Sequence, residues 1–186
     1  MRIPVIPTII VVTAVAIMVM LGFWQLGRAD EKGALIARYS AALDEGAQVS
    51  WPLAPQDIEQ SLYRRSSIAC VAVLGMAARA GTNANGANGW AHEAACNVAG
   101  SAEPVLVQLG WSRNPEGPVW EGGEVTGWIA PGPRLVADPA QAELQPLVRP
   151  DPSDLPNNHL AYAWQWFLFA LTALVIYILA LRRTAR

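Results

Sequence analysis

The stretch Asn157 to Tyr177 reads N-N-H-L-A-Y-A-W-Q-W-F-L-F-A-L-T-A-L-V-I-Y. No charged residue falls between Leu160 and Leu181, and a helix of that length crosses the hydrocarbon core of a bilayer. The run opens on His159 and continues with the aromatic residues that are typical of a membrane interface. Residues 157–181 therefore predict a transmembrane helix.

A second apolar run covers residues 3–26. A secretory signal peptide is the alternative interpretation, with Arg2 as its charged start. The run is longer than the apolar core of about 7–15 residues in such peptides, and it ends in Phe23-Trp24-Gln25-Leu26 rather than in a small-residue cleavage pattern. We therefore interpret it as a retained first transmembrane helix. The spacing of apolar residues predicts that the helix continues over residues 27–43.

Nearly all the charge lies between the two apolar runs. Nine basic and 15 acidic residues fall between Gly27 and His159, which gives this segment a net charge of −6 and argues against nucleic acid as a partner. Arg2 and the basic tail, residues 182–186, place both termini in the cytoplasm by the positive-inside bias. Residues 27–156 are thus expected in the periplasm or an equivalent compartment, and the protein in a bacterial inner membrane.

The middle segment predicts a sheet. β-branched and small residues, bounded by Gly, Pro and Asn turns, mark four strands. The expected strands are 63–74, 90–98, 105–111 and 124–130, after a short helix over 56–61, and residues 131–156 are expected to return to the membrane in extended form. The fold class predicted is an α+β membrane protein. Its two transmembrane helices flank a small antiparallel, barrel-like periplasmic domain, because closing the sheet would remove exposed edges.

Cys70 and Cys96 are the chain's two cysteines, and both lie in the segment expected outside the cytoplasm. That compartment tolerates disulfides. Their spacing alone leaves two alternatives open, a disulfide or two buried thiols on neighbouring strands.

One face of the second apolar helix gathers the residues that could carry chemistry. His159, Tyr162, Trp166 and Phe169 follow a 3-4-3 spacing, which puts them on one side of a helix. The imidazole could cap the helix, anchor it at the headgroups, or ligate a metal or haem iron. By residue type alone an anchor is favoured. A haem needs an axial ligand, apolar and aromatic surface, and cations for its propionates, and Arg28 could supply the last of these.

Two glutamines lie at similar expected depth in the two apolar runs. Burying an unpaired amide in lipid is costly, so Gln25 and Gln165 are expected to face each other or a bound partner. Trp24 fits an interfacial belt. Elsewhere, His92 is expected as a surface histidine on a strand. The sequence around Ser112 lacks the closing glycine of a nucleophile elbow, which disfavours a hydrolase.

Three segments together carry a family resemblance. Residues 21–32, LGFWQLGRADEK, match the pattern L-G-x-W-Q-x-x-R-x-x-x-K, and residues 157–170 match N-H-x-x-Y-A-x-Q-W-F-x-F-A. Residues 105–111, VLVQLGW, are similar to a V-L-V-N-R-G-W strand. These patterns resemble the surfeit-locus family of cytochrome c oxidase assembly proteins. Gln108 and Leu109 replace that strand's Asn and Arg, so no role of the arginine transfers.

The resemblance implies a membrane assembly factor, not an enzyme, that helps place haem a in the catalytic subunit of a haem-copper oxidase. It implies His159 as the haem-iron ligand, and haem a synthase as a second partner beside the oxidase subunit and the lipid bilayer. Motif positions also fall on the remaining candidate cofactor-binding residues, which are Trp24, Gln25, Arg28, Tyr162, Gln165 and Trp166.

Two rival functions keep the membrane location. A haem-free scaffold would stabilise an oxidase assembly intermediate by packing its aromatic belt on partner helices. A membrane oxidoreductase acting on haem or quinone would need redox or acid–base groups near the site, and the sequence offers only His159 and the tyrosines.

Overall fold

The computed structural model describes residues 4–184. The chain divides into two compact units, which we describe separately. The first comprises the residues up to Ile36 and from Leu155 onward, and the second comprises Ala37–Asp154. Arg2, Ile3 and Arg186, which the sequence analysis used for the first helix and the basic tail, lie outside the described residues.

Two helices form the first unit. α1 runs over Val5–Glu45, with its last turns in the second unit, and α3 runs over His159–Thr184. Both are long and apolar enough to cross a membrane. At 1.5 Å per residue α1 is about 60 Å long, roughly twice the thickness of a bilayer core. The first apolar run and the helical continuation predicted after it therefore form one uninterrupted helix.

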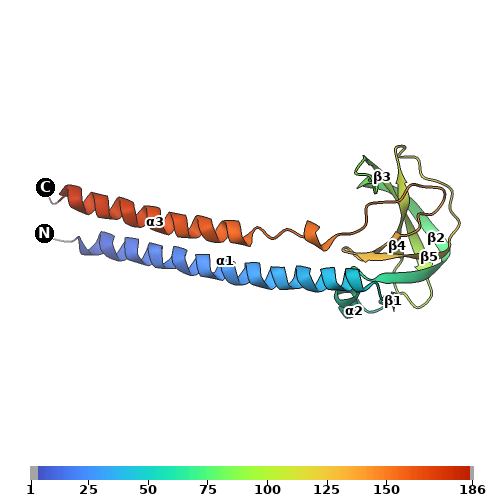
Figure 1. Cartoon of the computed structure of the whole chain (residues 1–186), viewed down its shortest axis with the longest axis horizontal. Coiled ribbons are helices and arrows are strands. Elements are labelled where there is room, and N and C mark those ends of the chain that lie inside the picture. Colours follow the sequence, from blue (N-terminus) through green and yellow to red (C-terminus); the bar gives the residue numbers. More distant parts are fainter. Residues whose placement is uncertain (1–3, 185–186) are drawn as a thin grey trace. The chain divides into compact units, whose positions relative to one another are not determined.

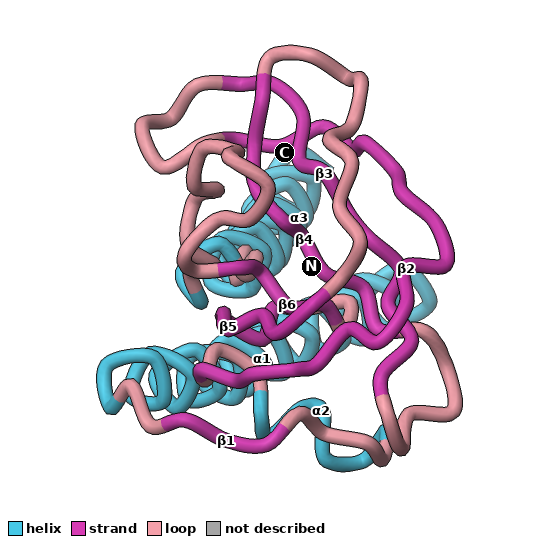
Figure 2. The backbone as a smooth tube through the Cα atoms, turned by 90° about the vertical axis from the view of Figure 1, so that its right-hand side faces the viewer, coloured by secondary structure: helices cyan, strands magenta, loops and turns pink. Residues whose placement is uncertain are grey.

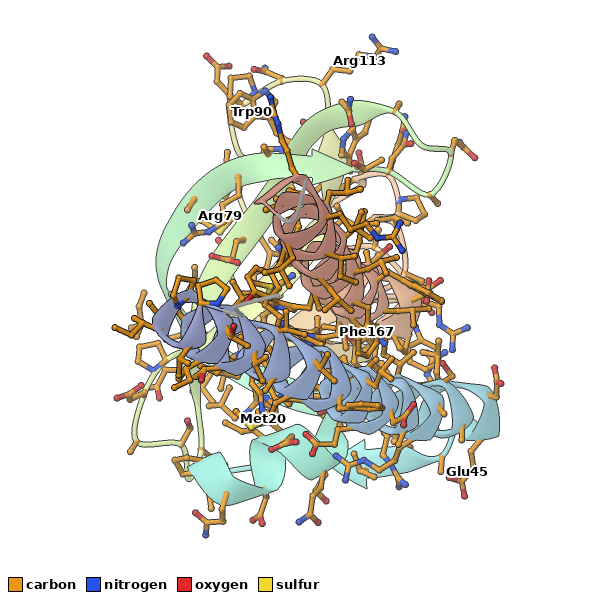
Figure 3. The ribbon with its side chains drawn as sticks, turned by 90° about the vertical axis from the view of Figure 1, so that its left-hand side faces the viewer. Met20, Glu45, Arg79, Trp90, Arg113 and Phe167 are labelled. Carbon is orange, nitrogen blue, oxygen red and sulfur yellow. A yellow bond between two sulfur atoms is a disulfide. The ribbon has the colours of Figure 1, made fainter. Side chains whose placement is uncertain are left out.

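The two helices lie side by side and run in opposite directions, so the start of α1 and the end of α3 lie at the same end of the pair (Figure 1). Near that end the hydroxyls of Thr8 and Tyr177 share a hydrogen bond. Further along, the rings of Phe23 and Phe167 meet edge to face with centroids 5.4 Å apart. Figure 3 shows Phe167 between the two helices.

Small residues line this helix contact. Gly22 on α1 and Ala163 and Ala170 on α3 are all buried. Small side chains let two helix backbones approach closely, which is the common way in which apolar helices associate inside a bilayer.

A six-stranded sheet and a short helix make up most of the second unit. In chain order the elements are β1 (Gln48–Ser50), α2 (Pro55–Ser61), β2 (Arg65–Thr82), β3 (Asn88–Val98), β4 (Val105–Ser112), β5 (Gly123–Ala130) and β6 (Arg134–Ala137), followed by a 3-10 turn at Pro152–Asp154. The four predicted strands and the predicted helix are present. β1 and β6 were not predicted, and β6 lies where an extended return path was expected.

The sheet expected to be antiparallel and barrel-like is antiparallel only in part. The strand order is β1-β2-β3-β4-β6-β5, and the β1–β2 and β4–β6 pairs are parallel, so the sheet is mixed. β2 is a long curved strand (Figure 2) whose residues 65–70 pair with β5 while residues 70–82 pair with β3. The sheet thus curls around one strand without being a closed barrel. The short parallel strands join segments far apart in the chain, a pairing that turn signals cannot reveal.

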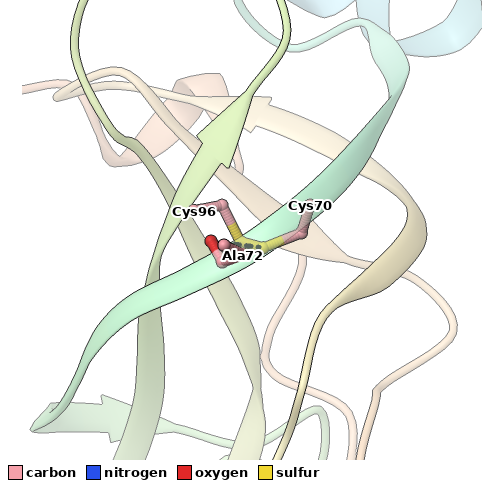
Figure 4. The surroundings of a disulfide bond; sticks show 3 residues. All are labelled: Cys70, Ala72 and Cys96. Carbon is pink, nitrogen blue, oxygen red and sulfur yellow. Dashed lines mark hydrogen bonds between the residues drawn. A yellow bond between two sulfur atoms is a disulfide. The ribbon is translucent and has the colours of Figure 1, made fainter.

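The core lies on the inner face of this sheet. Val107 and Leu109 of β4, Ile129 of β5 and Leu135 of β6 are fully buried. Cys70 of β2 and Cys96 of β3 join the same cluster and form a disulfide (Figure 4). Of the two alternatives that the sequence left open, the disulfide is therefore the one found.

Candidate functional site

His159 is the first residue of α3, where the helix begins beside α1. The two asparagines before it fix this start. The backbone carbonyl of Asn158 accepts the first helical hydrogen bond, from the N–H of Tyr162, at 3.2 Å. The side-chain amide of Asn157 donates to the carbonyl of Ala29 on α1 at 3.3 Å. The first bond begins the helix, and the second holds its start against α1.

The imidazole of His159 contacts Gln25 across the two helices. His159 Nδ1 lies 2.8 Å from Gln25 Oε1, and both side chains are partly buried. An amide oxygen only accepts, so Nδ1 carries the proton, and in a neutral imidazole the lone pair then lies on Nε2. Gln25 is bound by His159 and Gln165 is exposed, so the expectation that the two glutamines face each other is wrong. The alternative, that they face a bound partner, stays a prediction.

A hollow of about 290 Å³ opens beside His159. Its lining residues are Arg28, Glu31, Lys32, Leu35, Pro156 and His159. Arg28 Nη1 lies 2.6 Å from Glu31 Oε2, and both side chains are largely exposed. Lys32 is partly buried and makes no salt bridge within residues 4–184. The hollow therefore offers an imidazole nitrogen, one paired cation and one cation, Lys32, that has no carboxylate partner in the part of the chain the structure describes.

Sequence reasoning selected Arg28 but missed Lys32 and Glu31. The helical spacing could have identified both residues, because positions three and four after Arg28 share its helix face. Lys32 also occupies the last position of the pattern over residues 21–32.

The aromatic candidates extend from this site along α3. At 100° per residue, Tyr162, Trp166 and Phe169 fall within an arc of about 80° that starts at His159. Tyr162 and Phe169 are exposed, Trp166 is partly buried, and the rings of Trp166 and Phe169 meet edge to face at 6.2 Å. This set, which we call the aromatic flank, lies open beside the helix contact. Trp24 is also exposed, on α1.

His92 was expected on the surface, and that is wrong. It is fully buried on β3, with Nε2 2.8 Å from the hydroxyl of Ser112, while Nδ1 has no hydrogen-bond partner in the described part of the chain. The adjacent Glu93 is buried too and is bound by Arg79 at 2.9 Å. Among residues 4–184, no three His, Cys, Asp or Glu side chains gather closely enough to hold a metal ion.

A protein-family model described as the SURF1 family matches residues 12–171. The chain belongs to the SURF1 family. The match covers the whole sheet, the hollow beside His159 and the aromatic flank. A search of curated proteins found no match.

The SURF1 family is a family of assembly factors linked to cytochrome c oxidase. The resemblance found in the sequence is confirmed at this level. Two apolar helices of membrane-spanning length agree with a membrane protein of this family.

Proposed function

We propose that this protein is a membrane-anchored assembly factor that carries haem a to the catalytic subunit of a haem-copper oxidase. One observation carries the proposal. The His159–Gln25 hydrogen bond leaves Nε2 of His159 with its lone pair, next to a hollow that contains Arg28 and Lys32. An iron ligand and two cations thus lie at one end of an apolar helix pair.

The chemical types of these side chains suit the binding of haem. Haem iron takes an imidazole nitrogen as axial ligand, and His159 Nε2 supplies one. The porphyrin is flat and apolar, and the aromatic flank of Tyr162, Trp166 and Phe169 continues from His159 along α3. Propionates need cations, for which Lys32 has no competing carboxylate partner among the described residues. In this proposal Trp24, Gln25 and Gln165 contribute to the site from its edges.

The proposed placement is a membrane with the sheet unit on the oxidising side. The Cys70–Cys96 disulfide supports this, because disulfides persist in the periplasm and equivalent compartments rather than in the cytosol. Arg182 and Arg183 end α3 and favour the cytoplasmic side by the positive-inside bias. The sheet unit would then dock on the oxidase subunit, and haem a synthase would supply the cargo.

A haem-free scaffold is the second candidate. Trp164 and Phe169 are exposed to 69% and 53%, and such aromatic surface could pack on helices of an oxidase intermediate. This candidate uses the exposed aromatic side chains of α3 but gives His159 and Lys32 no role.

Co-expression with haem a synthesis separates the two candidates. The protein, purified in detergent, is mixed with the apo catalytic subunit, and the absorption spectrum of each is recorded after separation. The carrier proposal expects haem a on the protein before mixing and on the subunit afterwards. A colourless protein that still binds the apo subunit would favour the scaffold.

A further inference from the structure

We infer that Gln25 is a positioning residue that fixes the tautomer of His159 and keeps its bond to haem iron weak enough for the cargo to leave. The inference rests on the proposed function for its haem step. Its first part concerns the imidazole alone and stands without haem.

The hydrogen bond between His159 and Gln25 involves one particular ring nitrogen. Gln25 is on α1 and His159 on α3, 134 residues apart, and their 2.8 Å bond joins Nδ1 to an amide oxygen. Asn157 ties the same turn of α3 to α1 through Ala29. The ring is thus held from one side with Nε2 turned away from the acceptor. A histidine serving only as an interfacial anchor would need no such partner.

The amide oxygen of Gln25 that accepts the hydrogen bond is neutral, and this affects how strongly His159 Nε2 binds iron. Ligating histidines commonly donate their second N–H to a carboxylate or a carbonyl, and the acceptor raises the basicity of the ligating nitrogen. A carboxylate accepts a charge-assisted bond that is about twice as strong as a neutral one. The amide of Gln25 therefore orients the ring while adding less electron density to Nε2 than a carboxylate would.

A carboxylate lines the same hollow but is not the acceptor of the His159 hydrogen bond. Glu31 lines the same hollow as His159, yet its Oε2 is bound to Arg28 at 2.6 Å. Lys32 is the other charged group there. Gln25 is thus the acceptor although an acidic side chain lies close by. A carrier needs an iron ligand that is oriented but not too strong, because affinity is set mostly by the rate at which the bound molecule leaves.

The tautomer is tested without haem. The full-length protein, labelled with ¹⁵N-histidine in detergent, contains two histidines, and a His92→Gln variant assigns their signals. In mildly alkaline buffer His159 is expected as the Nδ1–H tautomer. Gln25→Leu should give a mixture of both tautomers, and Gln56→Leu, the same change at an exposed position of α2, should not. An Nε2–H tautomer in the wild type would overturn the inference.

The ligand strength is tested by loss of haem b, used as the probe, to excess apomyoglobin. Gln25→Glu should slow the loss about tenfold, and Gln25→Leu should speed it about tenfold, the lower end of the usual effect of such partners. Gln56→Leu should match the wild type. A general folding defect would speed haem loss in every variant and could not produce the slower loss expected for Gln25→Glu. An unchanged or faster rate of haem loss from Gln25→Glu contradicts the inference. A wild type that binds no haem contradicts the proposed function, while the tautomer result stands by itself.

Discussion

Gly22 on α1 lies directly against the ring of Phe167 on α3. A Cβ atom at position 22 would come within 3.0 Å of three ring carbons. The contact lies close to His159, which begins α3 two turns before Phe167. The packing of the two helices therefore helps to hold the imidazole beside Gln25.

Gly22→Ala should loosen this helix pair. Forcing an extra methyl group into a packed contact costs about 1–3 kcal/mol. Gly27→Ala is the matched control on the same helix, because a Cβ there meets nothing within 4 Å. Thermal unfolding in detergent should show a lower Tm for Gly22→Ala and an equal or higher Tm for Gly27→Ala. Equal Tm values for Gly22→Ala and the wild type would contradict the close packing of Gly22 against Phe167.

Reduction of the disulfide should destabilise the sheet unit. Cys70 and Cys96 are 26 residues apart, and closing a loop of that size in the unfolded chain stabilises the fold by about 3.5 kcal/mol in the chain-entropy model. Urea unfolding with and without reductant measures this difference. A double variant, Cys70→Ala with Cys96→Ala, should show the reduced stability and no response to reductant.

Stability should fall at alkaline pH through Tyr63. Burial raises the pKa of Tyr63, and the nearby Tyr39, Asp154 and Asp151 raise it further. The folded state thus keeps its phenol proton to higher pH than the unfolded chain, so its contribution is complete below about pH 10 and is lost above it. The loss is at most about 1.4 kcal/mol per pH unit. Urea midpoints between pH 9 and 11 should fall more steeply for the wild type than for Tyr63→Phe, and parallel curves would contradict this.

Lys32 should contribute to holding an anionic cargo. Lys32→Gln is expected to weaken retention of haem b about two- to fivefold, because a partly exposed charge pair is worth up to about 1 kcal/mol. Lys32→Arg keeps the charge and should behave as the wild type. Arg113→Gln removes the same charge from an exposed position in the second unit and is the control for net charge. Equal loss in Lys32→Gln and Arg113→Gln would mean that the charge acts nonspecifically.

The helices were predictable because their signal is local and long. An uncharged run of more than twenty residues has few alternatives to a helix of membrane-spanning length, and both runs gave one. The four longer strands were found by residue type and turns. β1 and β6 have three and four residues, too few to show a period, and their parallel partners are remote in sequence.

His92 was misplaced for a definite structural reason. A strand normally alternates between buried and exposed positions. The pairing of β3 with β4 shifts between His92 and Glu93, where β4 carries the extra residue Leu109, and the four residues from Ala91 to Ala94 are all buried. Alternation therefore fails at this point. The sequence gives no sign of a bulge without knowledge of the partner strand.

The candidate site was found in part. His159, Arg28 and Gln25 do come together, but their partners could not be read from the sequence. The ends of an apolar run are uncertain by a turn or two, and a shift of less than two turns decides whether Gln25 faces Gln165 or His159. The register of the two helices is set by Gly22 and Phe167, which lie far apart in the chain.

The proposed function requires that His159 holds haem a. Wild type, His159→Ala and His92→Gln are purified after co-expression with haem a synthesis, and their absorption spectra are compared at equal protein concentration. We expect a histidine-ligated haem a spectrum from the wild type and from His92→Gln, and at least a tenfold loss of bound haem in His159→Ala. Haem a bound to His159→Ala with an unchanged amount and spectrum would contradict the account.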